Sequence, residues 1–343
     1  MSSEAMETAR ARRVASSFSI RPGWAVLGGV GLLSLAVGPI PRTYQYAPLV
    51  VSVLVLGLPH GAVDHLIGPR QFGERLTVRW LAVVGALYLV LGAAYGLVWF
   101  LRPVAAFVGF ILLTWFHWGQ GELYPLIEFV DASYIRAPGQ RALTVLVRGG
   151  APMLVPLVAF PGEYEFVATT LTGLFDAGAA GSLVPLFEPR VRLLVGGAYG
   201  VLVLATVGLG YVRASERRPW LIDAGELGLL TAFFLAVPPI LAIGVYFTCW
   251  HSLRHISRTV FLDGPSVRAL ERGRVAPVAG RFARDAAPMT AGALALLGGL
   301  FLVVPGSLAG TTDLVALYLV LIAVLTLPHV VIVTWLDRAQ GVL

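Results

Sequence analysis

Long apolar runs follow one another along almost the whole of this 343-residue chain, and they constrain its fold more than any other feature. Hydrophobic side chains make up 57% of the residues and charged side chains only 13%, which is far more apolar than an ordinary soluble domain. Each run is near the length that a helix needs to cross about 30 Å of hydrocarbon. The sequence therefore predicts an all-α, polytopic transmembrane helical bundle.

We expect about ten spans, with eight as the smaller alternative, in a single membrane-embedded domain over residues 1–343. The spans are placed near 24–40, 46–67, 80–101, 103–121, 141–160, 191–212, 221–237, 239–258, 286–304 and 314–336. Two of these spans are separated at Pro238 and Pro239; a kink in one longer helix and a re-entrant break are the alternatives.

All 25 basic residues are arginines. They crowd the N-terminus and the loops near 70–79, 136–148, 213–218 and 254–284, whereas 161–189 is acidic. The positive-inside rule then predicts a multi-pass cell-membrane protein with both termini in the cytoplasm and a short basic segment at 1–23. The same rule explains the net charge of +6 without a nucleic-acid partner. Because a retinal Schiff base needs a lysine, the chain is not itself a rhodopsin.

The six histidines form four short clusters, each at one end of an apolar run. In the predicted topology all of them lie toward the cytoplasmic ends of the second, fourth, eighth and tenth spans. Imidazole is costly in hydrocarbon unless it is bonded, so this pattern favours a shared metal site inside the bilayer. Interfacial histidines that bond to backbone carbonyls are the alternative. The single cysteine, Cys249, excludes a thiolate cluster, so nitrogen and oxygen must hold the metal.

The clusters differ in how strongly they indicate ligands. His251 and His255 are four residues apart, so on a helix they share one face and can chelate one ion. His60 lies deeper in its span than His65 and beside Pro59, and is therefore the better ligand of that pair. Asp64 and His65 are better placed to hydrogen-bond to ligands.

His117 stands among tryptophans, with Gln120 and Glu122 beyond it as candidate outer partners; an interfacial aromatic belt is the alternative. His329 follows a proline and precedes an apolar stretch. This favours a buried histidine that is structural or that hydrogen-bonds near the ligands, and disfavours a ligand. Imidazoles without a thiolate suit iron(II), and also zinc or copper. Aromatic residues near the histidines favour a lipid-soluble substrate threaded between helices, and few carboxylates argue against proton-coupled ion transport. The expected tunnel residues are Trp115, Trp118, Phe247 and Trp250.

Four motifs in order resemble those of a known family: Pro-His-Gly-x-x-Asp-His at 59–65, His-Trp-Gly-Gln-Gly-Glu at 117–122, Tyr-Phe-x-x-Trp-His-Ser-x-Arg-His at 246–255 and Pro-His at 328–329. Between about 46 and 336 the chain resembles the bacterial and archaeal membrane β-carotene 15,15′-dioxygenases, also called bacterio-opsin-related proteins of the Brp/Blh type. The resemblance implies an iron(II) enzyme that uses O₂ to split the central double bond of β-carotene into two all-trans-retinal molecules. The product would then pass to an opsin.

Matching the motifs residue by residue implies that the iron ligands are His60, His117, His251 and His255. The residues implied to surround them are Asp64, His65, Gln120, Glu122, Tyr246 and His329. Two other classes of protein are the alternatives. A histidine-box lipid desaturase or hydroxylase needs more histidines than the six present here, and a bis-histidine haem carrier or metal permease predicts haem absorption or a chain of intramembrane acids.

Overall fold

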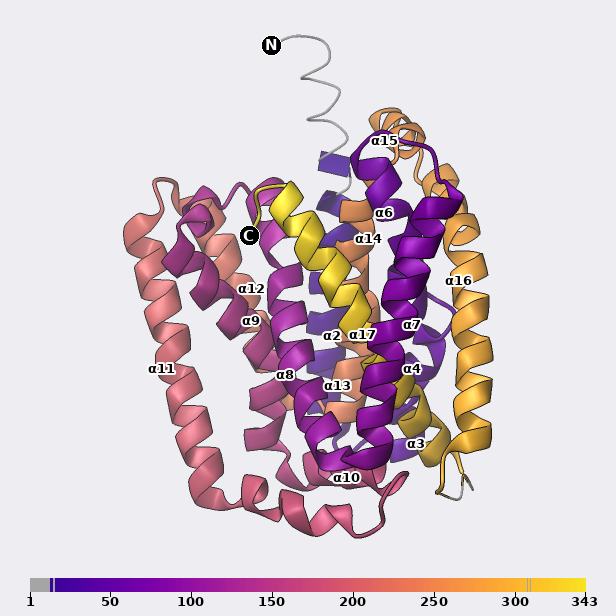
Figure 1. The fold of residues 1–343 in the computed structure, drawn as a ribbon. Helices are drawn as coiled ribbons and strands as arrows, with labels where there is room; N and C mark the ends of the chain where they lie inside the picture. Colours follow the sequence, from indigo (N-terminus) through magenta and orange to yellow (C-terminus); the bar gives the residue numbers. More distant parts are fainter. Residues whose placement is uncertain (1–12, 15, 307, 309) are drawn as a thin grey trace.

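The computed structural model describes residues 13–14, 16–306, 308 and 310–343, and this part of the chain is helical without a β-strand (Figure 1). The prediction of an all-α bundle is therefore confirmed. Most helices run along a common axis, while α10 and η3 lie at one end of the bundle (Figure 1). The elements are α2 (Arg21–Val37), α3 (Arg42–Gln45), α4 (Ala47–Ser52), α5 (Gly57–Gly61), α6 (Asp64–Gln71), α7 (Val78–Leu101), α8 (Pro103–Gly121), η1 (Pro125–Phe129), η2 (Ser133–Arg136), α9 (Pro138–Ala159), α10 (Pro161–Gly173), η3 (Ala179–Phe187), α11 (Pro189–Arg213), α12 (Arg217–Ala236), α13 (Pro239–Tyr246), η4 (Phe247–His251), α14 (Ser252–Val260), α15 (Gly264–Glu271), α16 (Ala276–Val303) and α17 (Thr311–Ala339).

Nine helical stretches among the described residues are long and apolar enough to cross a membrane, so the chain is a membrane protein. The tenth expected span, 239–258, is not one of the nine. It consists of α13, η4 and α14, which follow one another without a gap and run along the bundle axis (Figure 1). Its second half carries His251, Arg254 and His255, which make it more polar than the other spans.

The chain breaks at Pro238 and Pro239, which excludes one long kinked helix. Helix α12 ends at Ala236, and the ψ angles of 130° at Val237 and 140° at Pro238 are those of extended backbone. Proline at the start of α13 lacks the N–H that would continue the preceding helix, so two separate helices form.

The first span begins earlier than expected, at Ser16 rather than residue 24, and ends at Val37. Most of the predicted basic segment 1–23 lies outside the described residues. The start of α2 and the C-terminal end of the chain lie at the same end of the bundle (Figure 1). Which side of the membrane that end faces stays a prediction.

The second span is broken twice, and the sequence did not indicate the first of the two breaks. Helix α4 ends at Ser52 and α5 begins at Gly57, with Leu56 between them at φ +62°. A non-glycine residue rarely adopts this left-handed conformation, and such strain is typical of functional sites. A second break follows Gly61, before α6. As a result, His60 sits on a one-turn helix held between two breaks.

Glycines fix the position of α8, the helix that carries His117. A Cβ atom at Gly119 would overlap the backbone of Val145 in α9, and one at Gly149 would overlap the carbonyl of Trp115 in α8. The two helices therefore pack with their backbones almost in contact, as small residues allow in membrane bundles. Helix α9 also packs against α11 and α12, so it anchors α8 to that half of the molecule.

Candidate metal centre

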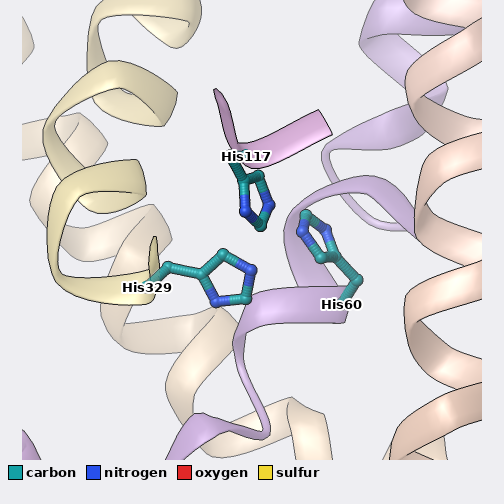
Figure 2. Close-up of side chains that lie close together, drawn as sticks. All are labelled: His60, His117 and His329. Carbon is teal, nitrogen blue, oxygen red and sulfur yellow. The ribbon is translucent and has the colours of Figure 1, made fainter. Parts of the chain in front are cut away.

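Five histidines from five different elements converge inside the bundle. They are His60 on α5, His117 on α8, His251 on η4, His255 on α14 and His329 on α17, and all are buried. Figure 2 shows the rings of His60, His117 and His329 turned toward one another. The centroid of the His60 ring lies 5.3 Å from those of His251 and His255 and 5.1 Å from that of His329. The centroid of the His117 ring lies 4.8 Å from those of His251 and His329.

A π-helical turn, η4, carries His251 into this cluster. The four-residue spacing of His251 and His255 predicted a shared face of a regular α-helix, but the chain changes from π-helix to α-helix between them. Such π-turns often occur at functional sites because they rotate the side chains that follow. Both rings still reach the cluster, where His251 lies beside His117 and His255 beside His329.

The cluster is rich in buried nitrogen atoms without partners. Buried Nε2 of His60, His255 and His329 and Nδ1 of His117 have no hydrogen-bond partner. The Nε2 atoms of His117 and His251 lie only 3.1 Å apart. An unsatisfied buried polar atom costs about 1–3 kcal/mol, so several in one place indicate that a ligand completes the site.

Ligand-type atoms gather in two overlapping groups, and the atoms within each lie within 4.8 Å of one another. One group is His60, His117 and His329, and the other is Asp64, His255 and His329. His329 belongs to both. The cluster can therefore hold a metal ion, and the donor set of imidazoles with a carboxylate nearby suits iron(II), zinc or copper.

Outer hydrogen bonds orient two of the rings. His60 Nδ1 is hydrogen-bonded to the carbonyl of Gly57, and His329 Nδ1 donates to Asp64 Oδ2 at 2.8 Å. The same carboxylate oxygen accepts from the Tyr88 hydroxyl at 2.6 Å. A metal-binding histidine ordinarily donates its second nitrogen to a carboxylate or carbonyl in this way. His60 and His329 thus both have the arrangement that leaves Nε2 free for a metal.

The remaining residues expected around the ligands lie at different distances from them. Asp64 bonds directly to His329, as described. His65 is buried, but its ring makes no contact with the other five, and its Nδ1 has no partner. Gln120 donates to Asp337 at 2.5 Å and to Thr334 at 3.1 Å, so it ties α8 to α17 rather than to a histidine.

Glu122 belongs to a separate set of buried charges, which we call the ion-pair network: Glu122, Arg148, Asp223, Glu226 and Arg254. Arg148 donates to Glu122 at 2.6 Å, to Glu226 at 2.9 Å and to Asp223 at 2.6 Å. Arg254 donates to Glu122 at 3.0 Å and to Glu226 at 2.5 Å. Both guanidinium groups are at most 1% exposed. The network joins the ends of α8 and α14, which carry His117 and His255, to α9 and α12.

Arg148, Asp223 and Glu226 were not among the predicted site residues, although charged residues inside predicted spans were a usable signal. Few carboxylates were expected near the site. The structure corrects this expectation, because Asp64 contacts the histidine cluster and three acids lie buried in the network. These three acids are paired with two arginines, since a lone buried charge would be far more costly.

A largely apolar cavity of about 1050 Å³ adjoins the cluster, and four of the five clustered histidines, all except His255, line it. Its size is at the upper end of the range of about 300–1,000 Å³ for small-molecule pockets. Of the four residues predicted to line a substrate tunnel, Trp118 and Phe247 line this cavity. Trp115 and Trp250 do not. Their indole N–H groups donate instead to Leu146 O at 2.8 Å and Glu122 at 3.0 Å, so they tie helices together.

Tyr246 also packs away from the histidines. Its ring lies 4.8 Å from that of Trp118 and 5.5 Å from that of Phe234, and its hydroxyl has no partner. Together the site offers neutral nitrogen donors at the wall of an apolar cavity within the bilayer. Such an arrangement suits metal-dependent chemistry on a lipid-soluble molecule.

The chain is similar to proteins of one known family along most of its length. Residues 51–337 match the family described as beta-carotene 15,15'-dioxygenase. A protein of Halobacterium salinarum named probable beta-carotene 15,15'-dioxygenase Blh is 48% identical over 336 residues, which cover 98% of this chain and 97% of that protein. A second protein of Halobacterium salinarum, probable beta-carotene 15,15'-dioxygenase Brp, is 29% identical over 88% of this chain and 86% of its own length.

A beta-carotene 15,15'-dioxygenase from an uncultured marine bacterium is 24% identical over 60% of this chain and 66% of that protein. No solved structure matches the chain.

Proposed function

The chain belongs to the β-carotene 15,15′-dioxygenase family, and from that premise we propose that it cleaves the central double bond of β-carotene with O₂ to give two molecules of all-trans-retinal. One observation supports this proposal above all others. Five buried imidazoles converge, four of them carry a nitrogen without a partner, and four of them line an apolar cavity that is large enough for a long hydrocarbon. An apolar substrate and a redox metal could meet there without water.

In this proposal iron(II) is held by His60, His117, His251 and His255, the four ligands carried over from the family motifs. When bound, iron supplies the redox chemistry that lets O₂ react with an alkene. The orphaned nitrogens of His60, His117 and His255 support the assignment. His329 is a fifth imidazole at the same centre, and Asp64 orients it. His65 lies outside the set.

The protein itself supplies position and environment. The cavity walls, which include Phe107, Trp118 and Phe247, hold a rigid conjugated chain by contact over its whole length. A fixed depth of insertion would place the central bond beside the histidines, and such positioning accounts for much of the rate in enzymes generally. The ion-pair network keeps α8 and α14 in register, which maintains the spacing between His117 and His255.

We further propose that the enzyme works in the cell membrane, takes β-carotene from the lipid and delivers retinal to an opsin. The histidine-box desaturase alternative is less favoured, because all five clustered rings surround one centre. The carrier alternative is tested by an absorption spectrum, which would show haem directly.

Expression in cells that accumulate β-carotene tests the proposal. We expect the orange colour to fade and all-trans-retinal to appear in extracts, with no retinal from a His251→Ala variant expressed at the same level. Unchanged β-carotene in cells that contain well-expressed, iron-loaded protein would contradict the proposed function. Longer carotenal fragments in place of retinal would contradict central cleavage.

A further inference from the structure

The cavity beside the histidines has an open side, and two helices form its margin. Among all residues that line the cavity, those exposed at the molecular surface belong to α7 and α16 alone. On α7 they include Gly85 and Leu89, and on α16 they include Met289, Gly292 and Leu296. Leu89 is 72% exposed and Met289 44% exposed. A residue that both lines a cavity and reaches the surface marks its mouth.

This mouth faces the hydrocarbon of the membrane. The spans Val78–Leu101 and Ala276–Val303 are strongly apolar, with mean hydropathies of 2.2 and 1.9 over an 18-residue stretch of each. Only 6% and 11% of the residues in these two stretches are buried inside the protein. Both helices pack against α17, and both stand at the same side of the bundle (Figure 1). Lining residues of α7 extend from Leu81 to Phe100, which corresponds to about 28 Å along a helix. The margin therefore extends across nearly the full hydrocarbon thickness of about 30 Å.

The glycines at the mouth leave space rather than close a helix contact. A Cβ atom at Gly85 or at Gly292 would meet nothing within 4 Å. In contrast, Gly119 and Gly149 occur where two backbones touch. Gly85 and Gly292 therefore leave open space where α7 and α16 border the cavity. Behind this gap, α5 packs against α16 and carries His60, whose unpartnered Nε2 belongs to the cluster.

In the described part of the chain, the polar end of the bundle offers no comparable route. Beyond the histidines, Arg258 pairs with Asp337 at 2.5 Å, and Arg70 pairs with Asp285 at 2.5 Å. Arg258 and Asp337 are at most 2% exposed. A hydrocarbon that entered there would have to separate buried ion pairs and cross water first, which is unfavourable for a molecule without polar groups.

We propose that the gap between α7 and α16 is a lateral portal through which a long apolar substrate passes from the bilayer into the cavity. This inference rests on the proposed function for the identity of the substrate, β-carotene. Gly85 and Gly292 are specificity-determining positions in this scheme, because their missing side chains set the width of the portal.

Bulky side chains at the portal test the proposal. In vesicles loaded with β-carotene, we expect Gly292→Trp and Gly85→Leu to lower kcat/KM for retinal formation by about tenfold or more, because access limits association. Bound iron and thermal stability should stay at the wild-type level. Gly299→Trp is the matched control, since Gly299 lies on α16, is exposed, has open space at its Cβ and does not line the cavity. Wild-type kcat/KM in both portal variants, or an equal loss in the control, would overturn the portal.

A labelling experiment separates failure of the portal from failure of the proposed function, because it needs neither iron nor turnover. In a Cys249→Ala background, Gly292→Cys and Gly299→Cys each carry one thiol for an apolar maleimide. We expect β-carotene in the vesicles to slow alkylation at position 292 several-fold and to leave position 299 unchanged. Equal rates at position 292 with and without β-carotene would contradict the portal even if the wild-type enzyme forms retinal. Protection at position 292 without any retinal would support the portal and reject the activity.

Discussion

The histidine cluster and the ion-pair network are both sets of buried polar groups within the same bundle, but they differ in how many of their polar atoms have hydrogen-bond partners. In the network, Arg254 Nε alone lacks a partner, and every carboxylate oxygen of its three acids accepts from an arginine, a tryptophan or a tyrosine. In the cluster, at least one nitrogen of His60, His117, His255 and His329 has none. Since buried polar groups are normally satisfied, the network is complete within the protein and the cluster is not.

This difference separates structure from function in a membrane interior. Charged residues inside spans are often taken as functional, but here five of them neutralise one another and hold helices together. The neutral histidines are the groups that require something from outside the chain. The two regions touch through α8 and α14, so the stability of one supports the geometry of the other.

The largest expected effect comes from removing a ligand of the cluster. We expect His251→Ala or His255→Ala to abolish iron retention and retinal formation, because each deletes one of the four proposed donors. His329→Ala should retain measurable iron. Elemental analysis of purified protein and chromatography of carotenoid extracts provide the measurements. Equal iron loss in single alanine variants of all six histidines would contradict the division into four ligands and two outer histidines.

The next largest effect is expected in the network. Arg148→Met should destabilise the protein by about 3–5 kcal/mol, because it leaves Glu122, Glu226 and Asp223 with too little positive charge in a buried site. Thermal unfolding in detergent measures the loss, with the exposed Arg190→Met as control. Wild-type stability of Arg148→Met would show that the network does not hold the helices together.

Asp64 connects the cluster to its surroundings and should give an intermediate effect. We expect Asp64→Asn to weaken iron binding by less than about tenfold, because the carboxylate orients His329, which lies beside the four proposed ligands and is not one of them. Titration of the apoprotein with iron(II) measures the change. Tyr88→Phe, which removes the other hydrogen bond to Asp64 Oδ2, should weaken binding less. Unchanged iron affinity in Asp64→Asn would mean that His329 does not contribute to the centre.

A substitution in the histidine cluster should change thermal stability less than one in the ion-pair network, and in the opposite direction. In iron-free protein, we expect His117→Leu to leave the thermal midpoint unchanged or to raise it, because it replaces an imidazole whose buried Nδ1 has no partner with an apolar side chain of similar size. The same kind of substitution in the network, Arg148→Met, destabilises the protein. A clear fall in the midpoint of iron-free His117→Leu would indicate that the cluster is bonded within the protein after all.

The smallest effect concerns charges outside the membrane. Burial raises the pKa of Asp263, but hydrogen bonds from Arg281 and Ser266 outweigh it and lower the pKa to about 2. The unfolded carboxyl has a pKa of about 3.9, so this group stabilises the fold above about pH 4, and the contribution is lost as the pH falls toward 2. The difference in thermal midpoint between wild type and Asp263→Asn should therefore shrink over that range. A constant difference would contradict the low pKa.

Much of this molecule could be predicted from local sequence. The apolar runs indicated the helices, and the confinement of the histidines to the ends of four spans indicated a common site. The separation of two helices at Pro238 and Pro239 was predicted from the two prolines. In contrast, nothing in the local pattern indicated the break before Gly57, because Leu56 has no preference for a positive φ.

The sequence by itself determined the all-helical membrane fold, the absence of thiolate ligands and the family motifs, because these depend on composition and on residues close together in the chain. Only the tertiary structure decided that His329 joins the cluster while His65 does not, that Trp115 and Trp250 tie helices together, and that Arg148 meets three acids. The physical reason is that each of these facts depends on contacts between residues far apart in sequence. How one helix rotates against its neighbours is set by packing, at positions such as Gly119 and Gly149, and periodicity alone does not reveal it.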